Sequence, residues 1–420
     1  MRVLIANFSY TGHHLHFCAL LAKAARDCGA TPVLVTPRGT TSALEFGAFK
    51  DQLFASATEV HELMPSHSAR GLLGSIMESR RMLEAVCALA PALCCDRVWV
   101  HFADMISNAA ILPLAPTTAV PIEALHLRSG YAYPMRGGLR KVVQFHSRRA
   151  TVCAPWEQSW HLDPIAFDDL SKDSKSIGLM PEPVEPPLAV TRGEARRELG
   201  LPESTRLLMV LGALDRRKGV VELLHGFRRR SPPDTALALM GPLYADIRHE
   251  VLVLARELGP TRCIVRDRVL SQREFGLAFA ASTWQALTYR RHTGSSGILV
   301  RAAAHGVPVI ASDFGWVGTA TRRFMLGETC DPDNTASIAD AIDRALQSMP
   351  SQSADAAAFV QFNTEANFIA HWGRRLREVA GLPADLAYCE WNGGSLTIDC
   401  PRAPNAKLPG ERGTERADVL

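Results

Sequence analysis

The segment Tyr289–Ser312 passes from a basic, glycine- and serine-rich loop into a helix and then into a short buried strand. The loop covers 290–297, and the apolar run 298–304 has helical spacing. Gly306 stands where a helix needs a left-handed terminator, and residues 307–311 follow as a strand. A small-residue loop that enters a helix presents backbone N–H groups and the positive end of the helix dipole, which suits phosphate. The same pattern also forms ordinary joints of α/β domains, so it predicts the fold class and leaves the function open.

The composition narrows the class of protein. The chain has 420 residues, of which 47% are hydrophobic and 21% charged, as in a globular protein of two domains. A net charge of +3 is too small to indicate a nucleic-acid partner. The ten cysteines lack the paired spacings of metal sites, and neither a signal peptide nor a bilayer-spanning apolar run is recognisable. We therefore expect a cytoplasmic protein that binds no nucleic acid.

The first half opens with a strand–loop–helix–strand pattern. The strand Arg2–Phe8 is followed by a helix over 15–28 and a second strand over 31–36. Such a unit begins a Rossmann-like fold with a parallel sheet. Gly12 lies in the loop at the carboxyl end of the first strand, where open α/β sheets bind ligands. The G-x-G-x-x-G spacing of a dinucleotide site is absent.

A later strand ends in a histidine. Residues 97–101 form the strand, which delivers His101 at its carboxyl end, and Asp104 follows closely. Such a histidine is suited to acid–base chemistry or to contact with a substrate, although a structural histidine fits the same pattern equally well. Between the second strand and this one, Glu59–Ala90 is predicted to be mainly helical, with a break near Pro65.

A basic segment lies between two further predicted strands, 120–127 and 150–155. Arg128–Arg149 combines arginines and a lysine with two tyrosines. A solvated surface is the ordinary interpretation of such a segment. The alternative is contact with an anionic acceptor or a membrane surface, which would place the protein peripherally on the inner face of a membrane.

The proline-rich segment Ser176–Pro187 reads as an interdomain linker. It predicts an N-terminal domain over 1–180 and a C-terminal domain over 188–360, followed by a closing helix over 361–380. Residues 381–420 are rich in proline, glycine and charge without periodicity, so we expect a disordered tail.

The second half repeats the strand–loop–helix pattern and supplies two glycine-bounded loops at strand ends, 212–219 and 290–297. The first carries Arg216, Arg217 and Lys218, and such side chains beside backbone amides suit a diphosphate. Neither loop has the G-x-x-x-x-G-K-[ST] pattern of a P-loop. Acidic pairs and histidine clusters with metal-ligand spacing are absent from the sequence, so we expect no metal or cofactor, with basic side chains neutralising the phosphates.

These loops resemble motifs of GT-B-fold glycosyltransferases, most closely the retaining family 4. GALDRRKG (212–219) and the VELLHGF that follows it match that family's GRL…KG…LL.AF segment. SGILVRAAAHGVPVIAS (296–312) matches its FG…LEAMA.G.PVIAS segment, and DRVWVH (96–101) resembles a strand end of the acceptor domain. The resemblance covers about residues 1–380 and implies an α/β protein of GT-B architecture, with two Rossmann-like parallel-sheet domains facing a cleft.

The resemblance implies transfer of a sugar from a nucleotide-sugar donor to an unknown acceptor, with retention and without metal. Lys218 falls on the lysine that neutralises the donor diphosphate, residues 295–297 on the loop near the phosphates, and His101 near the sugar or acceptor. The predicted catalytic residues are His101, Lys218 and Arg217. The predicted donor-binding residues are Gly12, Gly212, Arg216, Thr293, Gly294, Ser295, Ser296, Gly297 and Arg301.

Three positions depart from that family. Its two glutamates around the phosphate loop are Thr293 and Arg301 here, and the arginine of its GR pair is Ala213. Thr293 cannot act as a carboxylate. Arg301 could pair with an extra donor phosphate or with Asp313, or could form a purely structural salt bridge.

Two functions therefore remain open from the sequence. One is an active, divergent glycosyltransferase. The alternative is a catalytically inactive GT-B-fold protein that binds or regulates another glycosyltransferase. A nucleotide-sugar epimerase of the same shape fits less well, because the sequence offers no clear set of acidic side chains for the cleft.

Overall fold

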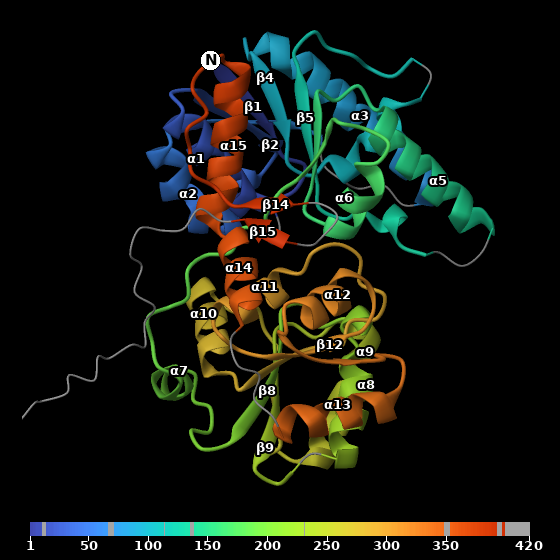
Figure 1. Ribbon diagram of the computed structural model, residues 1–420, viewed down its shortest axis with the longest axis vertical. Helices are drawn as coiled ribbons and strands as arrows, with labels where there is room; N and C mark the ends of the chain where they lie inside the picture. The colour runs from blue at the N-terminus through green and yellow to red at the C-terminus, as the bar shows by residue number, and fades with distance from the viewer. Residues whose placement is uncertain are drawn as a thin grey trace, which may run out of the picture.

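The computed structural model describes residues 1–10, 14–65, 71–112, 114–134, 138–230, 232–347, 353–392 and 397–399. The chain forms two α/β domains stacked end to end, and the last long helix returns from the second domain to lie along the first (Figure 1). The predicted fold class, two Rossmann-like parallel-sheet domains, is confirmed.

The N-terminal domain is built on a seven-stranded parallel sheet of order β3-β2-β1-β4-β5-β6-β7. Its strands are β1 (Arg2–Ala6), β2 (Thr31–Pro37), β3 (Glu59–Met64), β4 (Arg97–Val100), β5 (Ile122–His126), β6 (Gln158–His161) and β7 (Ile177–Leu179). Its helices are α1 (His14–Asp27), α2 (Leu44–Ala55), α3 (Gly71–Ala92), α4 (Ser107–Ala110), α5 (Gly138–Cys153) and α6 (Pro164–Leu170). The inner strands are buried on both faces, as in parallel sheets with helices on each side.

The C-terminal domain has a six-stranded parallel sheet of order β10-β9-β8-β11-β12-β13. Its strands are β8 (Arg206–Leu211), β9 (Thr235–Met240), β10 (Cys263–Arg266), β11 (Trp284–Leu287), β12 (Val309–Ser312) and β13 (Gly327–Cys330). Its helices are α7 (Arg192–Glu198), α8 (Val220–Arg230), α9 (Ala245–Leu258), α10 (Gln272–Ala281), α11 (Gly297–Ala304), α12 (Gly315–Arg323), α13 (Thr335–Gln347) and α14 (Ala354–Phe362).

Strand order reverses once in each sheet, between β1 and β4 and between β8 and β11. In open α/β sheets the connections diverge at such a point and leave a crevice at the carboxyl ends of the strands. The loops that follow these four strands begin at Asn7, His101, Gly212 and Thr288. The topology therefore brings the sequence-predicted loops to the edges where ligands bind.

Two segments join the domains and run side by side. Val184 of the first crossing pairs with Thr364 of the second in a parallel bridge, and Glu365 N donates to Val184 O at 3.3 Å. The second crossing leads into α15 (Glu365–Val379), whose predicted N-cap is confirmed because the Thr364 side chain accepts from Asn367 N. Part of the predicted linker is regular structure, since Ile177–Leu179 forms β7.

Helix α15 belongs to the core of the N-terminal domain. Phe368, Trp372 and Leu376 are buried with α1 and the face of the first sheet. The rings of Trp372 and Trp99 lie 4.6 Å apart, centroid to centroid. The N-terminal domain is thus completed by residues from the far end of the chain (Figure 1).

Two predictions of secondary structure from the sequence were wrong in part. Glu59–Met64 is the edge strand β3 rather than the start of a helix, because the helical pattern begins only beyond Pro65. Residues 150–153 are the last turn of α5, and the strand follows at Gln158. Both errors concern short segments, for which periodicity does not separate helix from strand.

The predicted tail also contains structure. The strands β14 (Glu390–Asn392) and β15 (Thr397–Asp399) pair antiparallel. Trp391 is buried among Trp316, Phe324 and Phe362 of the C-terminal domain. Cys389 is buried as well, and its backbone N donates to Asn367 Oδ1 at 2.8 Å, so this part of the predicted disordered tail is anchored at two neighbouring residues. Residues 393–396 and 400–420 of the predicted tail lie outside the described residues.

Candidate active site

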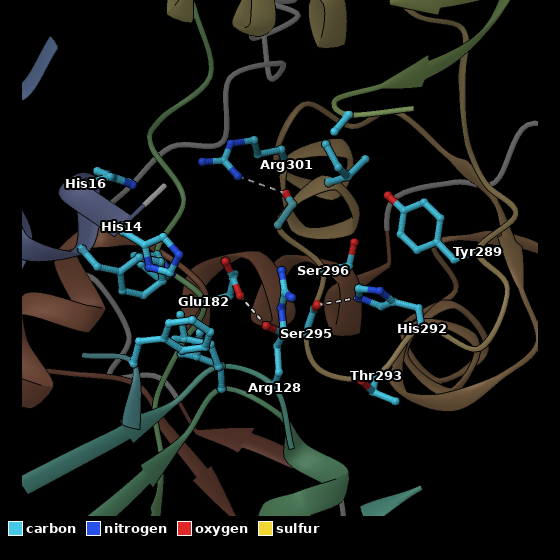
Figure 2. Close-up of a pocket in the computed structure, with 18 of the residues that line it drawn as sticks. His14, His16, Arg128, Glu182, Tyr289, His292, Thr293, Ser295, Ser296 and Arg301 are labelled. Carbon is cyan, nitrogen blue, oxygen red and sulfur yellow. Dashed lines mark hydrogen bonds between the residues drawn. The ribbon is translucent and has the colours of Figure 1, made fainter. Parts of the chain in front are cut away.

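A cavity of about 350 Å³ lies between the two domains, where the carboxyl ends of both sheets meet (Figure 2). From the N-terminal side and the linker it is lined by His14, His16, Phe17, Phe102, Leu127, Arg128, Leu162, Glu182 and Pro183. From the C-terminal domain it is lined by Ala213, Arg217, Lys218, Phe275, Tyr289, His292, Thr293, Ser295, Ser296, Gly297, Ile298 and Arg301.

Lys218 is held at the back of this cavity by the loop after β8. Asp215 begins a short 3-10 turn, and its side chain accepts a hydrogen bond from Lys218 N. The Lys218 side chain is only 7% exposed. Its Nζ donates to Tyr289 Oη at 2.9 Å and lies 4.3 Å from the centre of that ring. The hydroxyl and the ring of Tyr289 therefore position the ammonium group of Lys218, which borders the cavity.

The loops after β8 and β11 are docked on one another. Gly219 has φ +65°, and a Cβ there would lie 2.1 Å from Thr288 O, so only glycine allows this approach. Thr288 Oγ1 donates to Lys218 O at 3.2 Å, and Arg290 N donates to Arg217 O at 2.7 Å. The two predicted anion loops thus form one rigid edge.

His292 connects Arg217 to the second loop. Arg217 Nη1 and His292 Nδ1 are 3.0 Å apart, and His292 Nε2 is 2.9 Å from Ser295 O. Because a guanidinium only donates and a carbonyl only accepts, Nδ1 accepts and Nε2 carries the proton. The pKa of His292 is lowered to about 4, chiefly by burial. The hydrogen bond to the Ser295 carbonyl opposes this decrease, and the positive charges of Arg217 and Lys218 add to it. His292 is therefore neutral at pH 7, and it orients Arg217.

The segment 293–297 leads into the N-terminus of α11. Ser296 caps the helix, with its hydroxyl accepting from Leu299 N. Gly294 has φ +93°, and a Cβ there would lie 2.9 Å from Leu127 O of the opposite domain. The backbone of this loop therefore passes close to the N-terminal domain while residues 295–297 border the cavity.

Among the described residues, Glu182 supplies the one carboxylate that lines this cavity. It comes from the linker, where its backbone N donates to Asn363 Oδ1 at 2.9 Å. The Ser295 hydroxyl donates to Glu182 Oε2 (Figure 2). Burial raises the pKa of Glu182, while the Ser295 hydroxyl and the positive charge of Arg301 oppose that increase. A carboxylate thus lies beside the predicted phosphate loop. It comes from the linker, whereas Thr293 and Arg301 occupy the two positions at which the resembling family has glutamates.

Arg301 pairs with the linker rather than with Asp313. Its Nη2 and Nε lie 2.7 and 3.1 Å from Glu185 Oε2 and Oε1, and its Nη1 is 3.4 Å from Gly297 O. Burial acts to raise the pKa of Glu185, but hydrogen bonding and charge from Arg301 outweigh it and lower that pKa. The sequence left three roles open for Arg301: pairing with a donor phosphate, pairing with Asp313, or a structural salt bridge. The structure shows a salt bridge, and its acidic partner is Glu185.

His101 lies one layer behind the cavity. Its side chain is fully buried, and its Nε2 faces His14 Nδ1 at 2.9 Å. His14 packs on Phe102 and, unlike His101, lines the cavity. Next to it, His16 Nε2 lies 2.6 Å from Glu365 Oε1. Of His14 and His101, only His14 borders the cavity, and the catalytic role of His101 stays a prediction.

The other predicted residues divide into three groups. Arg217, Lys218, Thr293, Ser295, Ser296, Gly297 and Arg301 line the cavity. Arg216 turns away, with its Nη2 donating to Asp246 O at 3.0 Å. Gly212 lines a second cavity beside this one, Gly294 lies outside the wall of the first, and Gly12 lies outside the described residues.

Five cavity residues were not predicted from the sequence: Glu182, His14, Arg128, Tyr289 and His292. Tyr289 and His292 belong to the loop segment after β11, and this position at a strand end was a signal that could have identified them. Glu182 stood in a proline-rich linker, for which no motif indicates a site.

A second, more apolar cavity of about 430 Å³ adjoins the first through His16, Ala213, Phe275 and Arg301. Its remaining wall is formed by Glu45, Ala48, Phe49, Glu185, Gly212, Gly241, Pro242, Val269, Leu270 and Gln272. The two cavities therefore lie side by side, and the first has the more cationic wall.

Within the described residues, groups of three or more His, Cys, Asp or Glu side chains placed to hold a metal ion do not occur. In the same part of the chain, helices long and apolar enough to cross a membrane are also absent.

Several solved structures share this architecture. Sucrose-phosphate synthase from Thermosynechococcus elongatus aligns with a TM-score of 0.70 and 16% identity, over 91% of this chain and 99% of that one. HepE from Anabaena, solved with UDP and glucose, aligns with a TM-score of 0.62 and 15% identity, over 91% and 99%. The fold is GT-B.

A third GT-B neighbour is α,α-trehalose 6-phosphate synthase from Burkholderia multivorans, with a TM-score of 0.61 and 17% identity over 90% of this chain and 98% of that one. Protein-family models and curated proteins give no match. At these identities the similarity establishes the GT-B fold alone, so the function has to be argued from the cavity.

Proposed function

We propose that this protein is a glycosyltransferase that moves a sugar from a nucleoside-diphosphate sugar to an acceptor. The observation that carries the proposal is the charge of the interdomain cavity. Lys218, Arg217, Arg128 and Arg301 border it together with one carboxylate. Such an arrangement suits a diphosphate, because cations and backbone N–H groups stabilise its charge.

The two adjoining cavities match the two ends of a donor. The diphosphate would lie between Lys218, Arg217 and the backbone of 295–297, at the N-terminus of α11. The nucleoside would extend into the apolar cavity beside Val269 and Leu270. This leaves the sugar facing His14 and Glu182.

In this arrangement catalysis comes mainly from the departing diphosphate. As the glycosidic bond breaks, negative charge grows on the phosphate oxygens, next to Lys218 and Arg217. Groups fixed before the reaction stabilise that charge without reorganising. His292 contributes by holding Arg217 in place.

Glu182 is proposed to bind a hydroxyl of the donor sugar. Ser295 fixes its position, and Arg301 provides a positive charge nearby. Thr293 and Arg301 cannot supply a carboxylate, so the acidic group of the cavity comes from the linker. We further propose that the reaction is family 4-like, retains configuration and needs no metal.

A peripheral membrane contact is proposed for α5. Phe145 and Val142 are 63% and 52% exposed, and the exposed Lys141 and Arg149 lie on the same helix. Exposed apolar side chains with adjacent cations are typical of helices that bind anionic surfaces. A cytoplasmic protein could use this helix to reach an acceptor carried by lipid.

One observation favours the alternative of an inactive GT-B binding or regulatory protein. Arg301, in the position that resembles a donor-binding glutamate, is already paired with Glu185. Such a protein would bind a nucleotide without turnover, so binding and product formation must be measured separately.

Calorimetric titration with UDP, GDP and dTDP tests the donor site. Lys218→Ala should abolish most of the binding, and Lys23→Ala, which removes an exposed lysine of α1, serves as the matched control. Mass spectrometry of products from a panel of nucleotide-sugars, with and without EDTA, then tests turnover and the metal. If none of the nucleotides binds, the glycosyltransferase proposal is wrong; binding without products would support the alternative.

A further inference from the structure

The more apolar of the two adjoining cavities, of about 430 Å³, is closed on one side by the N-terminal domain. Glu45, Ala48 and Phe49 of α2 belong to its wall. These positions are spaced i, i+3 and i+4, so they share one face of the helix. Val269 and Leu270 of the C-terminal domain also belong to the wall. A ligand in this cavity would therefore lie between the two domains.

The ring of Phe49 is held in place by its neighbours. It stacks on the imidazole of His16, with 5.6 Å between the ring centres and 25° between the planes. His16 Nε2 in turn lies 2.6 Å from Glu365 Oε1, and Glu365 N donates to Val184 O in the segments that join the domains. The aromatic surface that Phe49 presents to the cavity is therefore fixed by α1 and α15.

Apolar side chains of the C-terminal domain line the same cavity. Val269 is 75% exposed, and Leu270 and Phe275 are half-buried. A flat aromatic ligand that lies against these side chains and against Phe49 would remove apolar surface from water. Nucleobases are ligands of this kind, because every base has an aromatic face that stacks on aromatic side chains.

The polar part of the wall disfavours the charged end of a donor. Glu45 and Glu185 bring carboxylates to this cavity. The positive charge of Arg301 is already matched by Glu185, whose Oε2 accepts from Arg301 Nη2 at 2.7 Å. A diphosphate here would meet the negative charge of Glu45, whereas a nucleoside carries no charge.

We propose that Phe49 of the N-terminal domain stacks on the nucleobase of the donor, so that both domains take part in nucleotide recognition. The inference rests on the proposed glycosyltransferase function, because it takes the nucleoside to lie in this cavity. The base then connects the two domains at a point separate from the diphosphate.

Calorimetric titration of the full-length protein with UDP, GDP and dTDP tests this role. Phe49→Leu keeps an apolar side chain that can pack beside α1 but removes the ring. It should weaken the nucleotide that binds the wild type most tightly by about five- to tenfold. Phe49→Tyr keeps the ring and should retain the affinity. Phe54→Leu, which changes an exposed phenylalanine of the same helix, is the matched control and should bind like the wild type.

Intermolecular NOEs provide a readout that a purely structural role of Phe49 would not change. In perdeuterated protein with protonated phenylalanines, protons of the bound base should show NOEs to phenylalanine rings. At least one of these NOEs should be lost in Phe49→Leu, and all should remain in Phe54→Leu. Wild-type affinity or an unchanged NOE pattern in Phe49→Leu overturns the proposal. If none of the three nucleotides binds the wild type, the donor site itself is wrong, and this inference falls with it.

Discussion

Arg301 of α11 forms a two-point ion pair with Glu185 of the linker, at 2.7 and 3.1 Å. The pair ties the C-terminal domain to the first crossing between the domains. We expect Arg301→Glu to destabilise the protein by roughly 2–3 kcal/mol, because it places a third carboxylate beside Glu182 and Glu185. Denaturant unfolding of the variant and the wild type measures the difference.

The charge-swapped double variant Glu185→Arg/Arg301→Glu is the control. It restores the opposite charges, so it should recover a substantial part of the lost stability. Equal stability of the double variant and Arg301→Glu would show that the pair contributes no coupling energy.

The adjacent arginines of the first loop should behave differently. Arg217 lines the cavity, whereas Arg216 is hydrogen-bonded to Asp246 O. Arg217→Ala should weaken UDP binding roughly tenfold or more, as expected for a charge-assisted hydrogen bond, and Arg216→Ala should leave it unchanged. Calorimetric titration with UDP measures the affinity of each variant. A larger loss of affinity in Arg216→Ala than in Arg217→Ala would contradict the assignment of Arg217 to the cavity.

Glu182→Gln should lower kcat about 10- to 100-fold while UDP affinity changes little, because the carboxylate is proposed to contact the sugar. Burial raises the pKa of Glu182 above its ordinary value of 4.5. The wild-type rate should therefore fall as the pH drops through that raised pKa, and Glu182→Gln should lack this acidic limb. An unchanged kcat would exclude Glu182 from the reaction.

Asp163 should make stability depend on pH. It caps α6 and accepts from Tyr133 Oη at 2.7 Å. Burial raises its pKa from 3.8 to about 6, so the folded state holds a proton that the unfolded state releases. Stability from this group is present below pH 4 and is lost as the pH rises to about 6, by on the order of 3 kcal/mol.

Asp163→Asn removes this titration and keeps an acceptor for the helix cap. The variant should show a flatter dependence of unfolding free energy on pH between 4 and 6, and higher stability at pH 8. Denaturant unfolding at several pH values measures both, and parallel curves for the two proteins would contradict the assignment.

Flotation with liposomes tests whether α5 binds a membrane surface. The wild type should float with anionic vesicles and not with neutral ones. Phe145→Asp should remove most of this binding, because it replaces an exposed apolar side chain by a negative charge. Recovery of the variant with the vesicles at the wild-type level would exclude this helix as the contact.

Local sequence patterns were sufficient to predict the fold class and about a third of the residues that line the cavity. Lys218 and residues 295–297 lie where strand ends meet small-residue loops, and such positions follow from periodicity and turn chemistry. Glu182 could not be found in this way, because its partner Ser295 is 113 positions away and the contact depends on how the linker passes the cavity. His14 was missed in favour of His101, because sequence spacing does not show which of two neighbouring histidines is covered.

Helix α15 has a consequence for biosynthesis. A ribosome releases the N-terminal sheet first, but Phe368, Trp372 and Leu376, which cover part of it, emerge only after the whole six-stranded sheet of the C-terminal domain. Domains generally fold as they leave the ribosome, so the first domain must wait with an apolar face exposed while the second one forms. A premature stop after residue 360 would leave the second domain nearly complete and the first one unfinished.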